Sequence, residues 1–477
     1  MASSSASWSA LFQGRRLVYT LLLTLSIGVH AIGIHMLATV LPSIVADLGG
    51  AAFYAWATLL YTIASIIGTV CGGFVTARLN LRRGYIVGAL VLLGGSVGCA
   101  TAPHMAVLLL ARTLQGLGSG LLVAIAYSMV SELYTDILRP HVLSAISGIW
   151  GMAALLGPLM GGVFAASGWW RGAFWVTTPV LIPLSVLAWY ALPAVDVKGG
   201  AGPFPLLRLA LLGAGVLGVA VSGQVTSLVL RLVLIGSAVV LVGWAFCLDT
   251  RATNRLFPSQ PLSLKTIVGT ASWIFLLFGM TSSQGTVFMP LVVHVLYGVS
   301  LLEAGYITAL LSMAWTIMAL YSASLLDRRV HLVIILGPLL ILCGVVGLAV
   351  YVAQGPLLLL GVCVSLIGAG IGVCFAHISS WTIAAARPGE GILTASAIPT
   401  IQSLGIAFGA AVAGLAANTA GLGTDISPAT VAAAATWVYR LGLIAPAALT
   451  VLAWRLVWLH RQRILCSERA QLCQHRG

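Results

Sequence analysis

The sequence predicts an all-α integral membrane protein, and three observations carry this prediction. Of the 477 residues, 60% are hydrophobic and only 7% are charged, whereas a soluble domain has about 25% charged residues. The mean hydropathy is +1.08. Long apolar runs alternate with short polar or Gly/Pro-rich breaks, and a run of about 20 apolar residues can cross a bilayer as a helix.

Cutting the chain at these breaks predicts fourteen membrane-spanning helices. The least marked break is VSGQVTS at 221–227, which divides an apolar stretch too long for one crossing. The expected helices cover residues 17–41, 52–76, 84–102, 106–130, 142–166, 173–193, 205–223, 227–247, 267–297, 303–325, 330–353, 356–384, 391–417 and 430–458.

The formal net charge of +13 belongs to the segments between these helices. Basic residues mark the N-terminus, alternate loops and the C-terminus, and cytoplasmic loops are the ones enriched in Arg and Lys. Both termini are therefore expected in the cytoplasm, on the inner face of a plasma membrane, which agrees with an even number of helices. No basic domain lies outside the membrane, so nucleic-acid binding is not expected.

The chain contains an internal repeat. Residues 53–102 align with residues 303–352 at a shift of 250, helix for helix and basic loop for basic loop, and such repeats are typical of transporters. We therefore expect two six-helix halves with two inserted helices between them. The expected parts are a cytoplasmic tail at 1–16, an N-terminal half at 17–193, a linker at 194–264 with inserted helices at about 205–223 and 227–247, a C-terminal half at 265–458, and a cytoplasmic tail at 459–477.

Several motifs resemble those of the major facilitator superfamily. ARTLQGLGSG at 111–120 is similar to the fourth-helix motif of that family, and WGMAALLGPLMGG at 150–162 is similar to the fifth-helix motif of its antiporters. The segments at 38–50 and 249–264 resemble the fourteen-helix drug:proton antiporter branch. The resemblance covers nearly the whole chain. It implies alternating access by two rocking halves and proton-coupled efflux of a small amphipathic compound, a drug or a secreted metabolite such as a siderophore.

The fifth-helix motif contains Gly157, Pro158, Gly161 and Gly162. Small residues let a neighbouring helix backbone approach closely, and a proline within a helix bends it. Tight packing alone would explain the same residues. A role in gating and in the direction of coupling therefore follows only from the resemblance.

Arg112 is the most informative single residue. It lies about two turns from the outer end of its helix, and a guanidinium there is costly unless it faces a partner or a wet cavity. Gln115 follows on the same helix face. Snorkelling to the surface is the alternative, but the resembling motif favours a site on the substrate and proton pathway. The equivalent stretch of the second half, VSLIGAGIG, has no Arg, so the site should be asymmetric.

The expected proton carrier is not an acid. The resembling antiporters place a carboxylate in the first helix, where this chain has Gly33, and no carboxylate lies deep in any expected helix. Histidine titrates near neutral pH, so His30 and His35 become candidates, although about 140° of helix rotation separates them. We favour His35 for the cavity and His30 for a hydrogen bond between helices, with neutral packing as the alternative for both.

Two glutamines, Gln284 and Gln402, complete the candidate pathway because they lie at a similar depth in the second half. Amides in membrane helices commonly bridge neighbouring helices, so ligand binding and simple bridging remain equally open.

The basic loop GFVTARLNLRRG at 73–84 occupies the position of a gating loop in the resembling family. It keeps three arginines, but Ala77 stands where the family has Asp, and Asn80 replaces a Gly. The usual ion pair that steadies the outward-facing state cannot form there. The second-half loop SLLDRR keeps an Asp-Arg pair, so gating should depend more on that half. The gating candidates in the two loops are Arg78, Arg82, Arg83, Asp327 and Arg328.

Three function classes remain open from the sequence. The first is proton-coupled export, the second is proton-coupled import of a small solute or siderophore on the same fold, and the third is a membrane sensor or scaffold that transports nothing. No phosphate-binding loop, nucleophile elbow or metal-spaced ligand set is present, so no enzyme activity, cofactor or metal is expected. The expected partners are a small-molecule substrate, protons and the lipid bilayer, and we expect a monomer.

Overall fold

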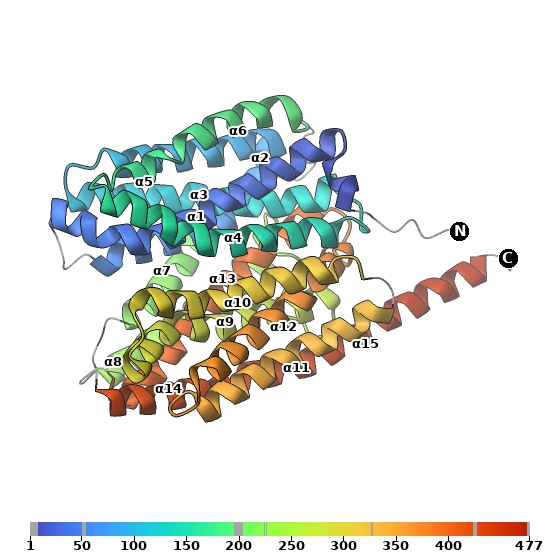
Figure 1. Cartoon of the computed structure of the whole chain (residues 1–477). Coiled ribbons are helices and arrows are strands. Elements are labelled where there is room, and N and C mark those ends of the chain that lie inside the picture. Colours follow the sequence, from blue (N-terminus) through green and yellow to red (C-terminus); the bar gives the residue numbers. More distant parts are fainter. Residues whose placement is uncertain are drawn as a thin grey trace.

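The protein is a bundle of long helices in two layers (Figure 1). The computed structural model describes residues 8–49, 54–194, 204–223, 225, 227–325, 328–422 and 427–474, and no strand occurs in these ranges. The first layer consists of η1 (Trp8–Phe12), α1 (Arg15–Leu48), α2 (Tyr54–Ala100), α3 (Met105–Leu133), α4 (Arg139–Ala166), α5 (Gly172–Trp175) and α6 (Thr178–Ala191).

The second layer is built from the later helices, and an additional pair precedes it in the chain. The additional pair is α7 (Leu206–Ser222) and α8 (Leu228–Thr250). The second layer consists of α9 (Ile267–Tyr297), α10 (Leu301–Ser322), α11 (Arg328–Tyr351), α12 (Leu357–Ala384), α13 (Gly391–Thr419), α14 (Pro428–Gly442) and α15 (Ile444–Gln474).

Within the described residues, twelve helical segments are long and apolar enough to cross a membrane. The prediction of an all-α membrane protein is therefore confirmed, whereas the expected number of fourteen crossings is not confirmed, since twelve candidate segments are found. The difference has two sources. One segment of 45 residues, Trp56–Ala100, contains two expected helices, and the apolar helix α7 has only 17 residues.

The break inside α2 falls at a single residue. Asn80 has φ 67° and ψ 170°, whereas the residues on both sides are helical. A positive φ is rare for residues other than Gly, and in combination with a ψ near 180° it is occupied almost only by Gly. The Asn80 side-chain oxygen then accepts a hydrogen bond from the Arg83 backbone N–H at 3.0 Å, in the manner of a helix cap. The expected seven-residue loop is therefore wrong, and Asn80 makes the turn alone.

Other helix ends also differ from the expected ones. The first helix continues to Leu48, and the expected helix at 173–193 is divided into α5 and α6. The expected helix at 430–458 is divided between α14 and α15. α15 then continues past 458 and projects from the bundle in Figure 1. No Gly or Pro interrupts residues 447–474, which explains why the helix does not stop at the membrane boundary.

The two layers repeat one packing arrangement. Glycines of α3 and α12 lie so close to a neighbouring helix that an added Cβ would fall about 2 Å from a backbone oxygen. The pairs are Gly116 with Tyr61, Gly120 with Ser65, Gly368 with Leu311, and Gly372 with Trp315. Both contacted residues of α2 lie 250 positions before those of α10, which matches the internal repeat. Arg112 lies four residues before Gly116 in α3, and Val364 lies four residues before Gly368 in α12. Val364 therefore occupies the position that corresponds to Arg112.

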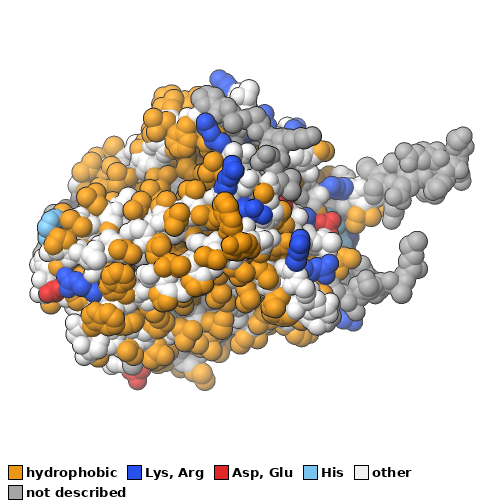
Figure 2. Space-filling view, turned by 90° about the horizontal axis from the view of Figure 1, so that it is seen from above, with side chains coloured by type: hydrophobic (Ala, Val, Ile, Leu, Met, Phe, Trp, Pro, Cys, Tyr) orange, Lys and Arg blue, Asp and Glu red, His pale blue; other side chains and the backbone are white. Residues whose placement is uncertain are grey.

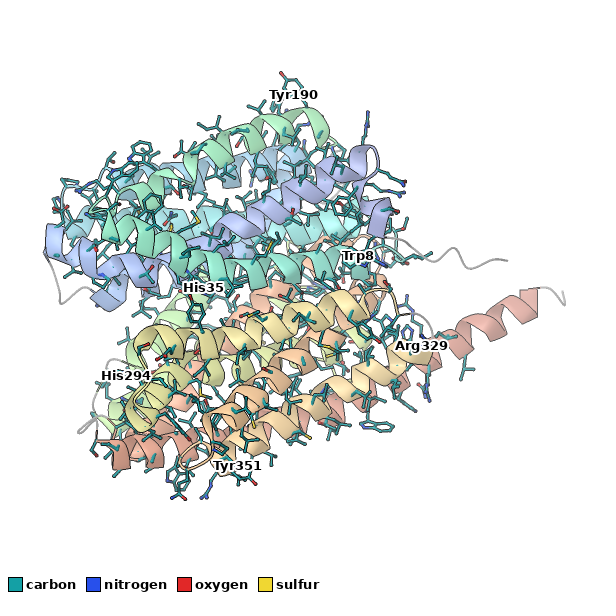
Figure 3. The ribbon with its side chains drawn as sticks, viewed as in Figure 1. Trp8, His35, Tyr190, His294, Arg329 and Tyr351 are labelled. Carbon is teal, nitrogen blue, oxygen red and sulfur yellow. The ribbon has the colours of Figure 1, made fainter. Side chains whose placement is uncertain are left out.

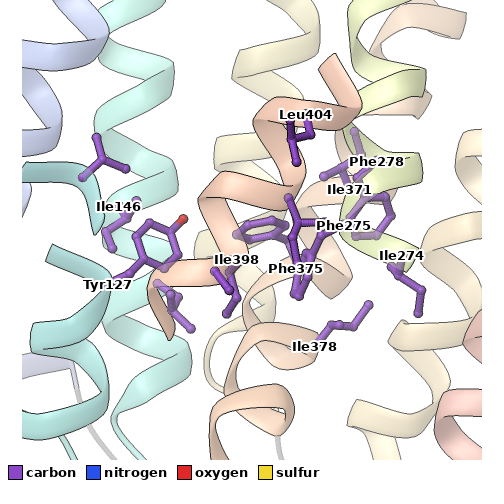
Figure 4. Packing of buried hydrophobic residues seen from close by; sticks show 14 of the residues in the cluster. Tyr127, Ile146, Ile274, Phe275, Phe278, Ile371, Phe375, Ile378, Ile398 and Leu404 are labelled. Atoms are coloured by element: carbon purple, nitrogen blue, oxygen red, sulfur yellow. The ribbon is translucent and has the colours of Figure 1, made fainter. Parts of the chain in front are cut away.

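The layers meet mainly along α13 and α10. α13 packs on α2 and α3, and Figure 4 shows Tyr127 and Ile146 of the first layer beside Ile398 of α13. On the other side of the interface, Thr316 of α10 donates a hydrogen bond to the Ser147 carbonyl of α4 at 2.8 Å. Apolar packing and this hydrogen bond therefore hold the two layers together.

The surface suits a lipid environment. Figure 2 shows hydrophobic side chains over most of the visible face, with Lys and Arg gathered mainly toward the end from which both chain termini emerge. Large apolar side chains such as Leu110 (72% exposed) and Leu358 (82% exposed) point outward from helices. Such side chains would be unfavourable in water over so wide an area and favourable in a bilayer.

The pair α7 and α8 lies against both layers. α7 packs on α2 and on α13. A buried ion pair between Arg208 and Asp249 ties the two helices together, and the Asp249 carboxylate also accepts backbone N–H groups of Leu256 and Phe257 at 2.8–3.1 Å. Removing one member would leave a buried charge uncompensated. No sequence pattern predicts this pair, because its members lie 41 residues apart in the chain.

Candidate transport site

A cluster of polar side chains lies inside the first layer, where α1, α2 and α3 meet. Its centre is Arg112, which is 1% exposed. The guanidinium lies 4.1 Å from the centre of the Tyr61 ring, and its Nε donates to the Ala57 carbonyl at 3.2 Å. Its Nη1 donates to the Gln115 side-chain oxygen. Gln115 in turn donates to Ser96 Oγ at 2.9 Å. Arg112 is thus held within the helix bundle and does not snorkel to the surface.

His30 belongs to the same cluster. Its Nδ1 lies 3.0 Å from the Tyr61 hydroxyl and also contacts Ser119 Oγ. The two hydroxyls lie 2.7 Å apart. The imidazole additionally packs edge-on against Trp150 of α4, with 5.5 Å between ring centres. His30 therefore bridges helices by hydrogen bonds, and the Tyr61 side chain connects it to Arg112.

A small cavity of about 10 Å³ adjoins this cluster, which is room for roughly one water molecule. Among its lining residues, Arg112 is the one charged group. Gly33 also lines the cavity, and a Cβ added at Gly33 would meet no atom within 4 Å. The position at which the resembling antiporters carry an acid therefore faces open space beside the guanidinium.

No carboxylate from the described residues contacts Arg112. The acidic side chains that the structure describes in helices or their caps lie within three residues of a helix end. They are Asp47, Glu132, Asp249, Glu303 and Glu390. The hydrogen bonds of Arg112 are made to neutral groups, and a full positive charge in a membrane segment is costly and typically functional.

His35 lies apart from this cluster. It is half-buried and points from α1 toward α10 of the other layer (Figure 3). Its backbone is held by the fifth-helix motif, because an added Cβ at Gly157 would come within 2.5 Å of His35 Cβ. An added Cβ at Gly161 would come within 1.9 Å of Thr39 Oγ1 and 2.6 Å of the Met36 carbonyl oxygen. The motif thus lets α4 cross α1 at the level of His35.

The remaining members of the motif behave differently. Pro158 lies inside α4 without ending it, and an added Cβ at Gly162 would meet nothing within 4 Å. Close contact with α1 therefore belongs to Gly157 and Gly161, whereas Gly151 approaches Thr316 of α10.

The two glutamines of the second layer do not join the cluster. Gln284 is buried on α9 and faces α14, since an added Cβ at Gly442 would lie 2.1 Å from its Oε1. That oxygen has no hydrogen-bond partner among the described residues. Gln402 is half-buried on α13, where its backbone carbonyl contacts Gly279 of α9.

The basic loop lies at the end of the bundle that carries both termini. Arg82 donates to the Leu192 carbonyl at 2.8 Å, whereas Arg78 and Arg83 are exposed. No ion pair with these arginines appears among the described residues. Asp327 and the side chain of Arg328 lie outside the described residues.

Sequence reasoning missed three members of the cluster, Tyr61, Ser96 and Ser119. A tyrosine in an apolar helix is more often a packing residue, and single serines are common in membrane helices. One signal was available, because Ser119 follows Gln115 by four residues and so lies on the same face of α3 as Gln115 and Arg112.

This fold, with a buried charged site inside a membrane-embedded bundle of two related layers, defines a multi-pass membrane transport protein. The chain belongs to the Major Facilitator Superfamily, whose family profile matches residues 23–410.

Curated relatives support the same class. A probable multidrug-efflux transporter of Mycobacterium tuberculosis is 32% identical over 435 residues, covering 88% of this chain and 91% of that protein. Multidrug resistance protein 3 of Bacillus subtilis is 26% identical over 292 residues, covering 60% of this chain and 56% of that protein. Among solved structures, the proton:xylose symporter XylE has a TM-score of 0.63 at 15% identity, covering 92% of this chain and 95% of that structure.

Proposed function

We propose that this transporter exports a small amphipathic organic compound in exchange for protons, by alternating access of its two layers. The observation that carries the proposal is the 32% identity, along nearly the whole chain, to a protein named as a probable multidrug-efflux transporter. The fifth-helix glycines support it, because they bring α4 against α1 next to a titratable side chain that points toward the opposite layer.

The proposal includes fourteen crossings with both termini in the cytoplasm. The break at Asn80 divides the longest segment into two lengths that can each span a bilayer. The 17 residues of α7 would reach about 25 Å, which is enough for a short crossing. The gathering of Arg and Lys near both termini supports the cytoplasmic assignment of that end.

In this proposal, His35 carries the proton and His30 fixes the site. His35→Asn is expected to blunt the pH dependence of transport across the range in which imidazole titrates. His30→Asn is expected mainly to lower thermal stability, because it disturbs buried hydrogen bonds to Tyr61 and Ser119, at about 1–3 kcal/mol. Transport rates from pH 5 to 8 and melting curves of both variants provide the check. Small and equal effects from the two substitutions would contradict this division of roles.

The direct test of proton-driven transport uses purified protein in liposomes. An imposed pH gradient is expected to drive an organic substrate against its concentration gradient, and dissipating the gradient with a protonophore is expected to stop it. Protein-free liposomes control for passive movement of a weak acid or base. Transport that ignores both the pH gradient and the membrane potential would exclude proton coupling.

A further inference from the structure

The interior of the first layer carries a positive charge that no carboxylate of the described residues balances. Arg112 is fully buried and hydrogen-bonded to neutral acceptors, and it is the one charged group that lines the adjoining cavity. The other cavity walls, from α1, α2, α5 and the segment before α6, are apolar or neutral polar. The electrostatic potential in this region is therefore positive.

The titratable groups that surround the guanidinium cannot reverse that sign near neutral pH. They are His30 on α1, and Tyr61 and Cys99 on α2. A histidine can add only positive charge, while tyrosine and cysteine stay neutral at pH 7 unless strongly perturbed.

A second buried arginine, outside the first layer, also has no acidic partner among the described residues. Arg231 of α8 is 3% exposed and donates to backbone carbonyls, including that of Gly414 at 3.2 Å. By contrast, the buried pair of Arg208 and Asp249 is neutral as a whole. The charges buried in the described helices thus sum to a positive value.

From this imbalance we propose that the exported compound is an organic anion, an apolar body that carries a carboxylate or a similar acidic group. The inference rests on the proposed function, because it names the charge class of the compound that the transporter moves. The compound does not enter the small cavity, which is too small for it. A unit charge about 10 Å from Arg112, at an effective dielectric constant of about 20, would change the dissociation constant by roughly tenfold. A cation would be disfavoured by a similar factor.

Gly33 offers a way to reverse the field without deleting Arg112. A side chain at this position has open space beside the guanidinium, so Gly33→Asp would place a carboxylate next to it and cancel its charge. Gly33→Asn has nearly the same size and no charge, so any change that it causes measures the effect of bulk alone.

The experiment measures binding of three fluorescent probes to the full-length protein in lipid nanodiscs. The probes share one aromatic scaffold and carry a carboxylate, a neutral methyl ester or a primary amine. The wild-type protein is expected to bind the carboxylate about tenfold more tightly than the methyl ester, and the amine about tenfold more weakly than the ester. Gly33→Asp is expected to remove most of this preference relative to Gly33→Asn. If Gly33→Asp does not fold, Arg112→Gln is expected to weaken the same preference.

Two results would overturn the inference while leaving export intact. One is wild-type protein that binds and moves the amine as well as the carboxylate. The other is a folded Gly33→Asp variant whose charge preference equals that of Gly33→Asn. If wild-type protein in liposomes moves none of several scaffolds in any charge form, the proposed export function fails, and this inference fails with it.

Discussion

Replacing Gly161 with valine is expected to abolish transport and to lower the melting temperature by several degrees. An added Cβ at this position would lie 2.6 Å from the Met36 backbone oxygen and 1.9 Å from Thr39 Oγ1. The threonine hydroxyl can rotate away, but the backbone oxygen cannot, so α1 and α4 must separate. Overpacking of this kind costs about 1–3 kcal/mol and would also displace the backbone next to His35.

Valine at the neighbouring Gly162 is the matched comparison. The two glycines lie on the same helix, yet an added Cβ at Gly162 would meet no atom within 4 Å. Gly162→Val is therefore expected to change the melting temperature and the transport rate much less than Gly161→Val does. Equal losses in the two variants would show that the motif acts through a property other than helix contact.

Replacing Arg112 with glutamine is expected to reduce transport about tenfold or more without lowering thermal stability. The guanidinium stacks on Tyr61 and bonds to Ala57 and Gln115, and losing such buried hydrogen bonds costs about 1–3 kcal/mol. However, the substitution also removes an unbalanced charge from a membrane segment, and that removal is favourable. The two contributions should nearly cancel in the stability of the protein while the function is lost.

Arg112→Lys tests whether charge alone is sufficient. Lysine keeps the charge but lacks the planar fork that reaches two acceptors while stacking on a ring. Transport is expected to remain low in this variant, although the charge preference of the binding site is retained. A melting temperature that falls together with transport in Arg112→Gln would instead assign the residue a purely structural role.

The fold was largely predictable because long apolar runs identify membrane-spanning helices in a sequence. The glycine repeats of α3 and α12 were also readable, since close backbone contact needs small residues at a fixed spacing. What the pattern could not supply was the length of the break at Asn80. The backbone is helical on both sides of Asn80, and the chain changes direction through the φ and ψ angles of this one residue.

The site was predictable only in part. Arg112, Gln115 and His30 stand out in the sequence because polar and charged side chains are rare in membrane helices and costly there. Their common partner Tyr61 does not stand out, since an aromatic side chain fits apolar packing equally well. The pair of Arg208 and Asp249 was missed because its members are joined only in the folded protein. Conversely, Gln284 and Gln402 of the second half do not join the cluster. Gln284 faces α14, and position along a sequence does not show which neighbouring helix a side chain meets.

The central claim is that substrate and protons cross the membrane in opposite directions through this protein. The most direct measurement adds substrate to one side of proteoliposomes without any imposed pH gradient and follows the internal pH with a trapped dye. Exchange predicts that protons move toward the side from which substrate departs, and that Arg112→Gln abolishes this movement. Protons that travel in the same direction as the substrate, or that do not move at all, would contradict the account.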